Sequence, residues 1–194
     1  MLAKAQELAV KMDVKGSVEF IHADVQVLRD QLEGQYDLIL FHNVIEYIDD
    51  PQQALQNIRT WLAPGGLLSL RHLNRYSNVY VPAMQDNNLD LAAKYLNSPW
   101  FKSSFNAEIQ TYTGEEIQNM LLNAGFISPE RYGIMSLCGF IPDNEIKYNE
   151  TFYRELKALE MSMAQQFPYY HIARFGLFLT TKDDTVFALS AIAE

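Results

Sequence analysis

The stretch that decides the fold runs from residue 36 to residue 70 and reads YDLILFHNVIEYIDDPQQALQNIRTWLAPGGLLSL. It opens on Tyr36–Phe41, a nearly continuous apolar run that is typical of a strand buried on both faces of a parallel sheet. The Asp-Pro pair at 50–51 favours a helix start, and Ala63–Gly66 contains the Pro and Gly that end a helix. Leu67–Leu70 is then the next buried strand. The order strand, helix, strand predicts two neighbouring parallel strands.

Helices and strands alternate over most of the remaining chain. We expect helices at 2–13, 25–32, 90–96, 113–124 and 150–166, and further strands at 17–22, 126–134 and 175–181. This alternation predicts an α/β fold with a mostly parallel sheet and helices on both faces. Apolar spacing predicts one buried face on the first and last of these helices. The residues on these faces are Ala5, Leu8, Ala9 and Met12, and Phe152, Leu156, Leu159 and Met163.

The chain is expected to form one domain over residues 1–182, with an insertion at about 73–110. The insertion is predicted because Asn, Pro, Trp and Tyr occur there without a clear period. Residues 183–194 form a tail to which we assign no structure. A hydrophobic content of 48% is enough for a buried core and excludes global disorder.

The composition also indicates the cellular compartment and limits the classes of possible partner. No stretch reaches the roughly 18 uninterrupted apolar residues of a membrane span, and the charges in MLAKAQELAVK come too early for a signal peptide. The single cysteine, Cys138, cannot form an internal disulfide, so we expect a buried, inert thiol and a reducing, cytoplasmic location. A net charge of −9 makes a broad phosphate-binding surface improbable, because such surfaces are rich in Lys and Arg. It does not exclude a small, local basic pocket. The four histidines show no metal-site spacing, and we predict no metal.

Several segments together resemble one enzyme superfamily. The Asp-Pro helix start and the Leu-x-Pro-Gly-Gly turn at 62–66, with an apolar strand on either side, resemble the class I S-adenosylmethionine-dependent methyltransferases. Within that superfamily, the chain most resembles the bacterial methyltransferases that esterify 5-carboxymethoxyuridine in tRNA. The similar segments are FIHADVQ (20–26), DLILFHNVIEYIDDPQQAL (37–55), LAPGGLLSL (62–70), T-x-x-E-I-x-x-M-L-x-x-A-G-F (113–126) and YYHIARFGLFLTTK (169–182).

This resemblance implies S-adenosylmethionine as the cofactor and methyl transfer to a carboxylate on a modified wobble uridine, with the tRNA anticodon loop as partner. Because a carboxylate is already ionised at pH 7, no general base is required, and we name no catalytic residue. Two alternatives stay open: a methyltransferase of small-molecule carboxylates, and a catalytically silent methyltransferase fragment. The sequence does not indicate an oligomeric state.

The resemblance also assigns residues to the cofactor. Asp24, after the strand expected at 17–22, would accept a hydrogen bond from the adenine amino group, and Val25 would pack on the adenine. A helix cap is the alternative role for Asp24. His42 and Asn43 end the strand at 36–41, and ligands bind at that edge in open α/β sheets. They are expected near the methionyl group or the acceptor.

The acceptor is expected to contact a second set of polar and aromatic residues. These are Tyr47, Arg71, Asn74, Tyr76 and Arg174. In the resembled family an arginine at the position of Arg174 pairs with the carboxylate of the acceptor, a task that suits the two-pronged guanidinium. The alternatives are an ordinary surface ion pair for Arg174 and solvated loop positions for the others.

One family element is missing from this sequence. Members of the superfamily open on a strand and a D-x-G-x-G-x-G turn that hold the cofactor, and the only adjacent glycine pair here is Gly65-Gly66. The chain therefore resembles a member without its first strands, or a rearranged or partnered variant. We expect impaired cofactor binding, no pairing partner for Val18–Ile21, and an exposed apolar edge at Tyr36–Phe41.

Overall fold

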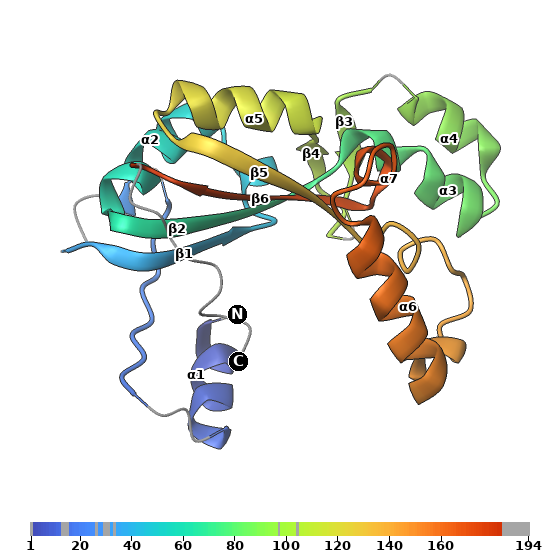
Figure 1. The fold of residues 1–194 in the computed structure, drawn as a ribbon, viewed down its shortest axis with the longest axis horizontal. Coiled ribbons are helices and arrows are strands. Elements are labelled where there is room, and N and C mark those ends of the chain that lie inside the picture. The colour runs from blue at the N-terminus through green and yellow to red at the C-terminus, as the bar shows by residue number, and fades with distance from the viewer. Residues whose placement is uncertain are drawn as a thin grey trace. The chain divides into compact units, whose positions relative to one another are not determined.

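A computed structural model describes residues 2–12, 16–25, 27–28, 32, 34–96, 98–103 and 105–183. The chain forms two compact units, Met1–Glu33 and Gly34–Glu194. The second unit holds the sheet and nearly all of the helices (Figure 1).

The sheet of the second unit has the strand order β1-β2-β6-β5. Its strands are β1 (Tyr36–His42), β2 (Leu62–Leu73), β5 (Ile127–Ile134) and β6 (Phe175–Thr181). β1 and β2 pair in parallel, with Leu38 opposite Leu67 and Phe41 opposite Leu70, which confirms the prediction for these two segments. β6 runs antiparallel to both β2 and β5. The expectation of a mostly parallel sheet was therefore wrong, because the chain enters β6 at the end where β2 finishes.

Two helices build the core on one face of the sheet. In α2 (Pro51–Trp61), the Asp50 carboxylate accepts the Gln53 N–H at 2.9 Å, as the Asp-Pro pair predicted. α5 (Gly114–Asn123) begins at a capping box between Thr113 and Glu116. Figure 1 shows both helices along the strands. The residues buried between helices and sheet include Leu55, Ile58, Leu68, Leu70, Ile117, Leu121, Phe126 and Phe178.

β1 lies at an edge of the sheet, where we expected exposed apolar side chains. Among the described residues β1 pairs only with β2. Leu38 and Leu40 point to the face opposite the buried Phe41 and are 51% and 62% exposed. The predicted exposed edge is thus confirmed for the described part of the chain.

The remaining helix of substantial length lies beyond the end of β5. α6 (Glu150–Met163) extends below the strands in Figure 1, whereas α5 lies above them. The Gly133 N–H in β5 donates to the Ala164 carbonyl just after α6, at 2.6 Å. Leu156 and Met163 are buried as predicted, but Leu159 is 49% exposed and is not part of the buried face.

The insertion is more regular than its composition indicated. It contains η3 (Arg75–Asn78), α3 (Tyr80–Met84), α4 (Leu89–Tyr95), and the short hairpin of β3 (Trp100–Lys102) and β4 (Glu108–Gln110). Only α4 was predicted. Other short 3-10 or α turns are η2 (Ile45–Tyr47), η4 (Ile146–Tyr148) and α7 (Tyr169–Ile172).

The first unit departs from two expectations. α1 (Leu2–Lys11) forms, but none of its residues is buried, so its predicted apolar face is not a core face. Residues 17–22 are not a strand, because a strand needs a hydrogen-bonded neighbour and none of the described residues supplies one. Much of the helix expected at 25–32 lies outside the described residues, as does the tail from 184 to 194. Within the described part, no helix has the length and apolar content to cross a bilayer.

Candidate functional site

Polar side chains gather where β1 and β2 reach their carboxyl ends. His42 and Arg71 are opposite each other in the parallel pair, and the His42 Nε2 lies 2.9 Å from the Ser69 hydroxyl. Arg71 Nε donates to the Asn43 side-chain oxygen at 3.2 Å, and the Asn43 N–H donates to the Arg71 carbonyl at 2.8 Å. Asn43 has a φ of 54°, which turns the chain out of the strand at this point. The structure therefore brings together three of the predicted site residues.

Two arginines share one aromatic ring at this edge. The guanidinium carbon of Arg71 lies 5.0 Å from the centre of the Phe175 ring, and that of Arg174 lies 5.7 Å from it. Arg174 also lies 5.3 Å from the Phe101 ring and donates to the Ser77 hydroxyl at 3.4 Å. Aromatic faces attract cations, so the rings hold both guanidinium groups in place.

Arg174 carries a positive charge that no acid neutralises within the described residues. The ion pairs found there involve Lys4, Arg75, Arg131 and His171, and none involves Arg174. Burial lowers the pKa of Arg174 to about 10, which still leaves it protonated at pH 7. A partly buried guanidinium without a carboxylate partner is poised to bind an anion.

A buried carboxyl group interacts with Arg71 and with the end of β2. Glu46, in η2, is 4% exposed, and its Oε1 accepts the N–H of Leu73 at the end of β2. No described residue hydrogen-bonds its Oε2. Burial raises the pKa of Glu46, and the Leu73 N–H and Arg71 counteract only part of that effect. The loop pattern in the sequence gives no sign of this burial, because it does not show that η2 folds back onto β2.

Asn74 has a different role from the predicted one. It is 1% exposed, and its Nδ2 donates to the carbonyls of His171 and Ala173 at 2.7 and 2.8 Å. Its Oδ1 accepts the Tyr76 N–H at 3.3 Å. The side chain is thus engaged within the protein and joins η3 to the segment before β6, which corrects the expected acceptor contact.

The other predicted residues lie in different places. Tyr47 and Tyr76 are 49% and 46% exposed, on η2 and η3 respectively, and stay predicted acceptor contacts. Asp24 and Val25 belong to the first unit, which is described separately from the sheet. Their assignment to the adenine therefore stays a prediction.

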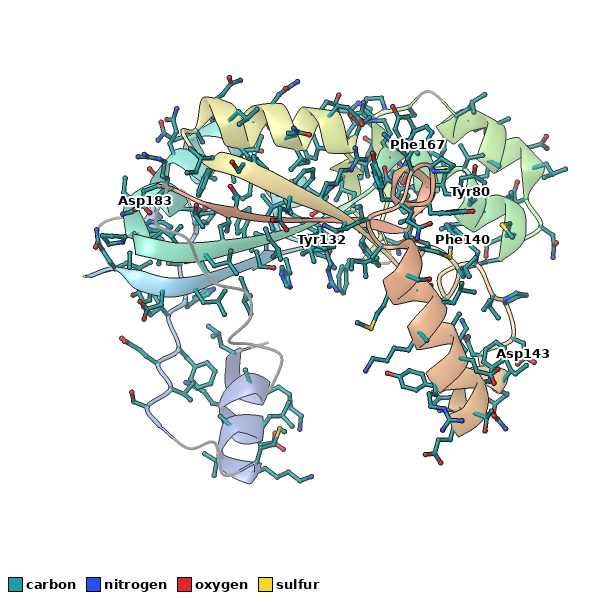
Figure 2. All side chains as sticks on the ribbon, in the orientation of Figure 1. Tyr80, Tyr132, Phe140, Asp143, Phe167 and Asp183 are labelled. Atoms are coloured by element: carbon teal, nitrogen blue, oxygen red, sulfur yellow. The ribbon has the colours of Figure 1, made fainter. Side chains whose placement is uncertain are left out.

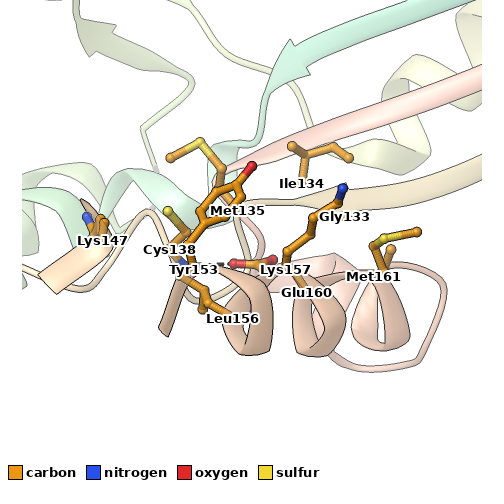
Figure 3. A pocket seen from close by; sticks show the side chains of 11 residues that line it. Gly133, Ile134, Met135, Cys138, Lys147, Tyr153, Leu156, Lys157, Glu160 and Met161 are labelled. Carbon is orange, nitrogen blue, oxygen red and sulfur yellow. Dashed lines mark hydrogen bonds between the residues drawn. The ribbon is translucent and has the colours of Figure 1, made fainter. Parts of the chain in front are cut away.

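Several cavities lie elsewhere in the second unit, including the following two. One, of about 480 Å³, is walled by Tyr76, Tyr80, Phe167 and His171 among others. The other, of about 450 Å³, lies between the end of β5 and α6, with Cys138, Tyr153 and Met161 in its wall (Figure 3).

A structural carboxylate holds one side of the second cavity together. The N–H groups of Ser136, Leu137 and Cys138 donate to the Glu160 carboxylate at 2.7–2.8 Å. Three such bonds anchor the loop after β5 to α6. We therefore attribute the Glu160 carboxylate to fold stability.

Comparison with known proteins identifies the family. Residues 5–127 match the model of a methyltransferase domain. The chain belongs to this methyltransferase family. The match covers most of the first unit and also β1, β2 and α5, so it includes the edge where His42, Asn43 and Arg71 meet.

Individual relatives match shorter segments. The tRNA 5-carboxymethoxyuridine methyltransferase of Escherichia coli K12 is 40% identical over 76 residues, which are 39% of this chain and 29% of that protein. The ubiquinone biosynthesis O-methyltransferase of Shewanella pealeana is 27% identical over 79 residues, which are 41% of this chain and 31% of that protein. In both cases the match spans less than a third of the relative.

Solved structures show that the methyltransferase fold extends over nearly the whole chain. A possible histamine N-methyltransferase from Thermotoga maritima has a TM-score of 0.54 at 17% identity, covering 93% of this chain and 69% of its own. An S-adenosylmethionine-dependent methyltransferase from Clostridium acetobutylicum has a TM-score of 0.55 at 11% identity, covering 93% and 70%. The fold is thus that of class I methyltransferases, as the sequence predicted, and family and fold imply binding of S-adenosylmethionine or S-adenosylhomocysteine.

Proposed function

We propose that this methyltransferase domain transfers a methyl group to a carboxylate carried by a modified wobble uridine of tRNA. The observation that carries the proposal is Arg174, a partly buried guanidinium without an acidic partner among the described residues. The partial match to the Escherichia coli tRNA enzyme supports the choice of acceptor.

The two arginines suit an anionic acceptor. Arg71 and Arg174 contact the same Phe175 ring. An acceptor carboxylate bound by Arg174 would therefore also be attracted electrostatically by Arg71. Charge-assisted hydrogen bonds from a guanidinium are about twice as strong as neutral ones and fix the plane of a carboxylate. These residues would therefore orient the acceptor oxygen.

No proton needs to move in this reaction. A carboxylate is ionised at pH 7 and can accept the methyl group directly. The task of the protein is to hold the acceptor oxygen in line with the donor and to keep water away. The aromatic rings of Phe101 and Phe175 beside Arg174 provide an apolar wall for that purpose.

The residues at the end of β1 fit the polar end of the cofactor. When bound, S-adenosylmethionine supplies a methyl group on a positively charged sulfur. Burial, and next the charge of Arg71, lower the pKa of His42, so its imidazole is neutral at pH 7 and adds no repulsion to that sulfur. The Asn43 side chain is oriented by Arg71. We assign His42 and Asn43 to the cofactor, with Asp24 and Val25 as the adenine contacts that the family resemblance implies.

The test is a methyl-transfer assay with S-adenosylmethionine labelled in the methyl group. The protein is given tRNA with 5-carboxymethoxyuridine, the same tRNA with unmodified uridine, and free carboxylic acids in separate reactions. Because the expected product is a methyl ester, mild alkali should release the label as methanol, and only from the carboxylate-bearing tRNA.

Each other outcome counts against the proposal. Label on free acids without tRNA would support a small-molecule methyltransferase. Label that resists alkali would place the methyl group on a base or ribose. Failure to label any acceptor, with calorimetry showing no cofactor binding, would support a catalytically silent domain.

A further inference from the structure

Four aromatic rings from three elements face the cavity of about 480 Å³. Tyr76 lies in η3, Tyr80 begins α3, and Phe167 and His171 come from the segment leading into and through α7. Figure 2 shows Phe167 and Tyr80 close together at the end of the molecule that carries α7 and α3. Phe167 is 73% exposed and Tyr76 is 46% exposed, so both present ring surface to solvent.

The rings of this cavity are not stacked face to face on one another. Tyr76 and Phe167 meet His171 at interplanar angles of 53° and 83°, with ring centres 6.4 and 5.4 Å apart. The parallel contact of His171 is made instead with Tyr170, at 4.5 Å and 29°. Phe167 also meets Tyr170 at 69°, so neither Tyr76 nor Phe167 is covered by a parallel stacking contact among the described residues.

Two segments of the chain connect the cavity to Arg174. Ser77, which accepts a hydrogen bond from Arg174 at 3.4 Å, directly follows Tyr76 in η3. Arg174 itself follows His171 by three residues. Asn74 joins the two segments through its bonds to the His171 and Ala173 carbonyls. Residues that line the cavity are thus sequence neighbours of Arg174 and of its hydrogen-bond partner Ser77.

We propose that this cavity binds an unpaired nucleobase next to the modified uridine, stacked on Phe167 and Tyr76, while Arg174 binds the carboxylate of that uridine. The inference rests on the proposed function. Loop nucleotides of RNA are recognised by stacking their splayed bases on aromatic side chains. The cavity volume lies within the range of about 300–1,000 Å³ that is usual for small-ligand sites. The polarity of each part is complementary to its ligand. The mainly apolar cavity would bind the uncharged base, and the Arg174 guanidinium would bind the carboxylate of the uridine.

The experiment measures the affinity of the full chain for a synthetic RNA stem-loop with 5-carboxymethoxyuridine in its loop. Two further RNAs carry an abasic residue on the 5′ or the 3′ side of the modified uridine. We expect one abasic RNA to bind about tenfold more weakly, the usual effect of one lost stacking contact. Phe167→Leu, which keeps an apolar side chain but removes the ring, should weaken binding of the complete RNA by a similar factor.

The two losses should not multiply, because they remove the same contact. Tyr76→Leu provides a second variant, and circular dichroism checks that each variant is folded. Tyr148→Leu is the matched control, since its ring is 84% exposed and does not face the cavity; it should bind as the wild type does. Equal binding of the abasic and complete RNAs, or multiplying losses, would overturn the base pocket.

Failure of the proposed function gives a different result in the same assay. In that case an RNA with unmodified uridine would bind as tightly as the carboxylated RNA, whatever the effect of the abasic residues. Absence of binding to every RNA would overturn both proposals.

Discussion

At the scale of single residues, His72 shows how burial shapes the chemistry of the sheet. Its side chain is fully buried, and its ring stacks on Phe178 with centres 6.0 Å apart. Nδ1 lies 3.0 Å from the Leu73 carbonyl, whereas Nε2 has no partner among the described residues. Burial, with only partial compensation by the Leu73 carbonyl, lowers the pKa of His72 to about 4.

His72 makes the stability of the protein depend on pH. The pKa of His72 is 6.5 in the unfolded chain and about 4 in the folded chain. At pH values between these two, His72 is protonated in the unfolded chain but not in the folded chain. The free energy of unfolding should therefore fall as pH is lowered through this window, by about 3 kcal/mol in total from this residue. Urea denaturation at several pH values measures the slope. His72→Gln should flatten it, and an unchanged slope would show that other groups cause the loss.

At the scale of elements, β6 depends on a glycine opposite that histidine. Gly176 pairs with His72 in the ladder between β6 and β2. A Cβ atom at Gly176 would lie 2.2 Å from Nε2 of the His72 ring, and the buried ring has no room to move. The missing side chain is thus what allows the ring to lie over the middle of the sheet.

Gly176→Ala should lower the free energy of unfolding by about 2 kcal/mol, the usual size of an overpacking effect in a core. Chemical denaturation measures this change. In a His72→Ala background the same substitution should cost much less, because the clashing ring is absent. An equal loss of unfolding free energy in both backgrounds would mean that the backbone conformation of Gly176 matters, and not the space left by its missing side chain.

The elements differ in how far the sequence determines them. β1, α2 and β2 were predictable because local signals agree: an apolar run, an Asp-Pro start and a Pro-Gly-Gly stop. β3, β4 and α3 have no such signals and depend on tertiary contacts. Residues 17–22 have the composition of a strand, but no strand among the described residues pairs with them.

The residues of the candidate site also differ in how far the sequence predicts their positions. The positions of Arg71 and Arg174 followed from strand ends and from the family resemblance. The burial of Glu46 and Asn74 did not, because it depends on how η2 and η3 fold back on the sheet. The arrangement of the rings around Phe167 also depends on tertiary packing, and the sequence shows only the neighbouring aromatic residues Tyr169, Tyr170 and His171.

At the scale of the whole molecule, the open edge of the sheet governs behaviour in solution. In the described part of the chain, β1 has a partner strand on one side only, and its other side offers backbone hydrogen-bonding groups next to the exposed Leu38 and Leu40. Exposed, apolar edge strands of this kind pair with other chains.

We expect the 194-residue chain to self-associate as its concentration rises, and sedimentation velocity measures this directly. Leu40→Lys should shift the population toward the monomer, because a charge on an edge strand opposes pairing. Leu122→Lys is the matched control, since Leu122 is 47% exposed on α5 and away from the edge, and it should leave association unchanged. Equal effects of the two substitutions would show that β1 is not the contact.

The net charge of −9 makes the arginine pair a local exception on an acidic molecule. Long-range attraction to RNA is therefore weak, and recognition has to come from short-range contacts at Arg174 and its aromatic neighbours. Discrimination for the acceptor should depend on its carboxylate more than on its phosphates.

The most direct test compares two RNA stem-loops that differ only in whether the 5-carboxymethoxyuridine is a free acid or its methyl ester. The wild-type protein should bind the acid about tenfold or more tightly, as a charge-assisted pair provides about 1.5–3 kcal/mol. Arg174→Gln should bind both RNAs equally, whereas Arg154→Gln on α6 should keep the preference. An Arg174→Gln protein that still prefers the acid, or a wild type without preference, would contradict the account.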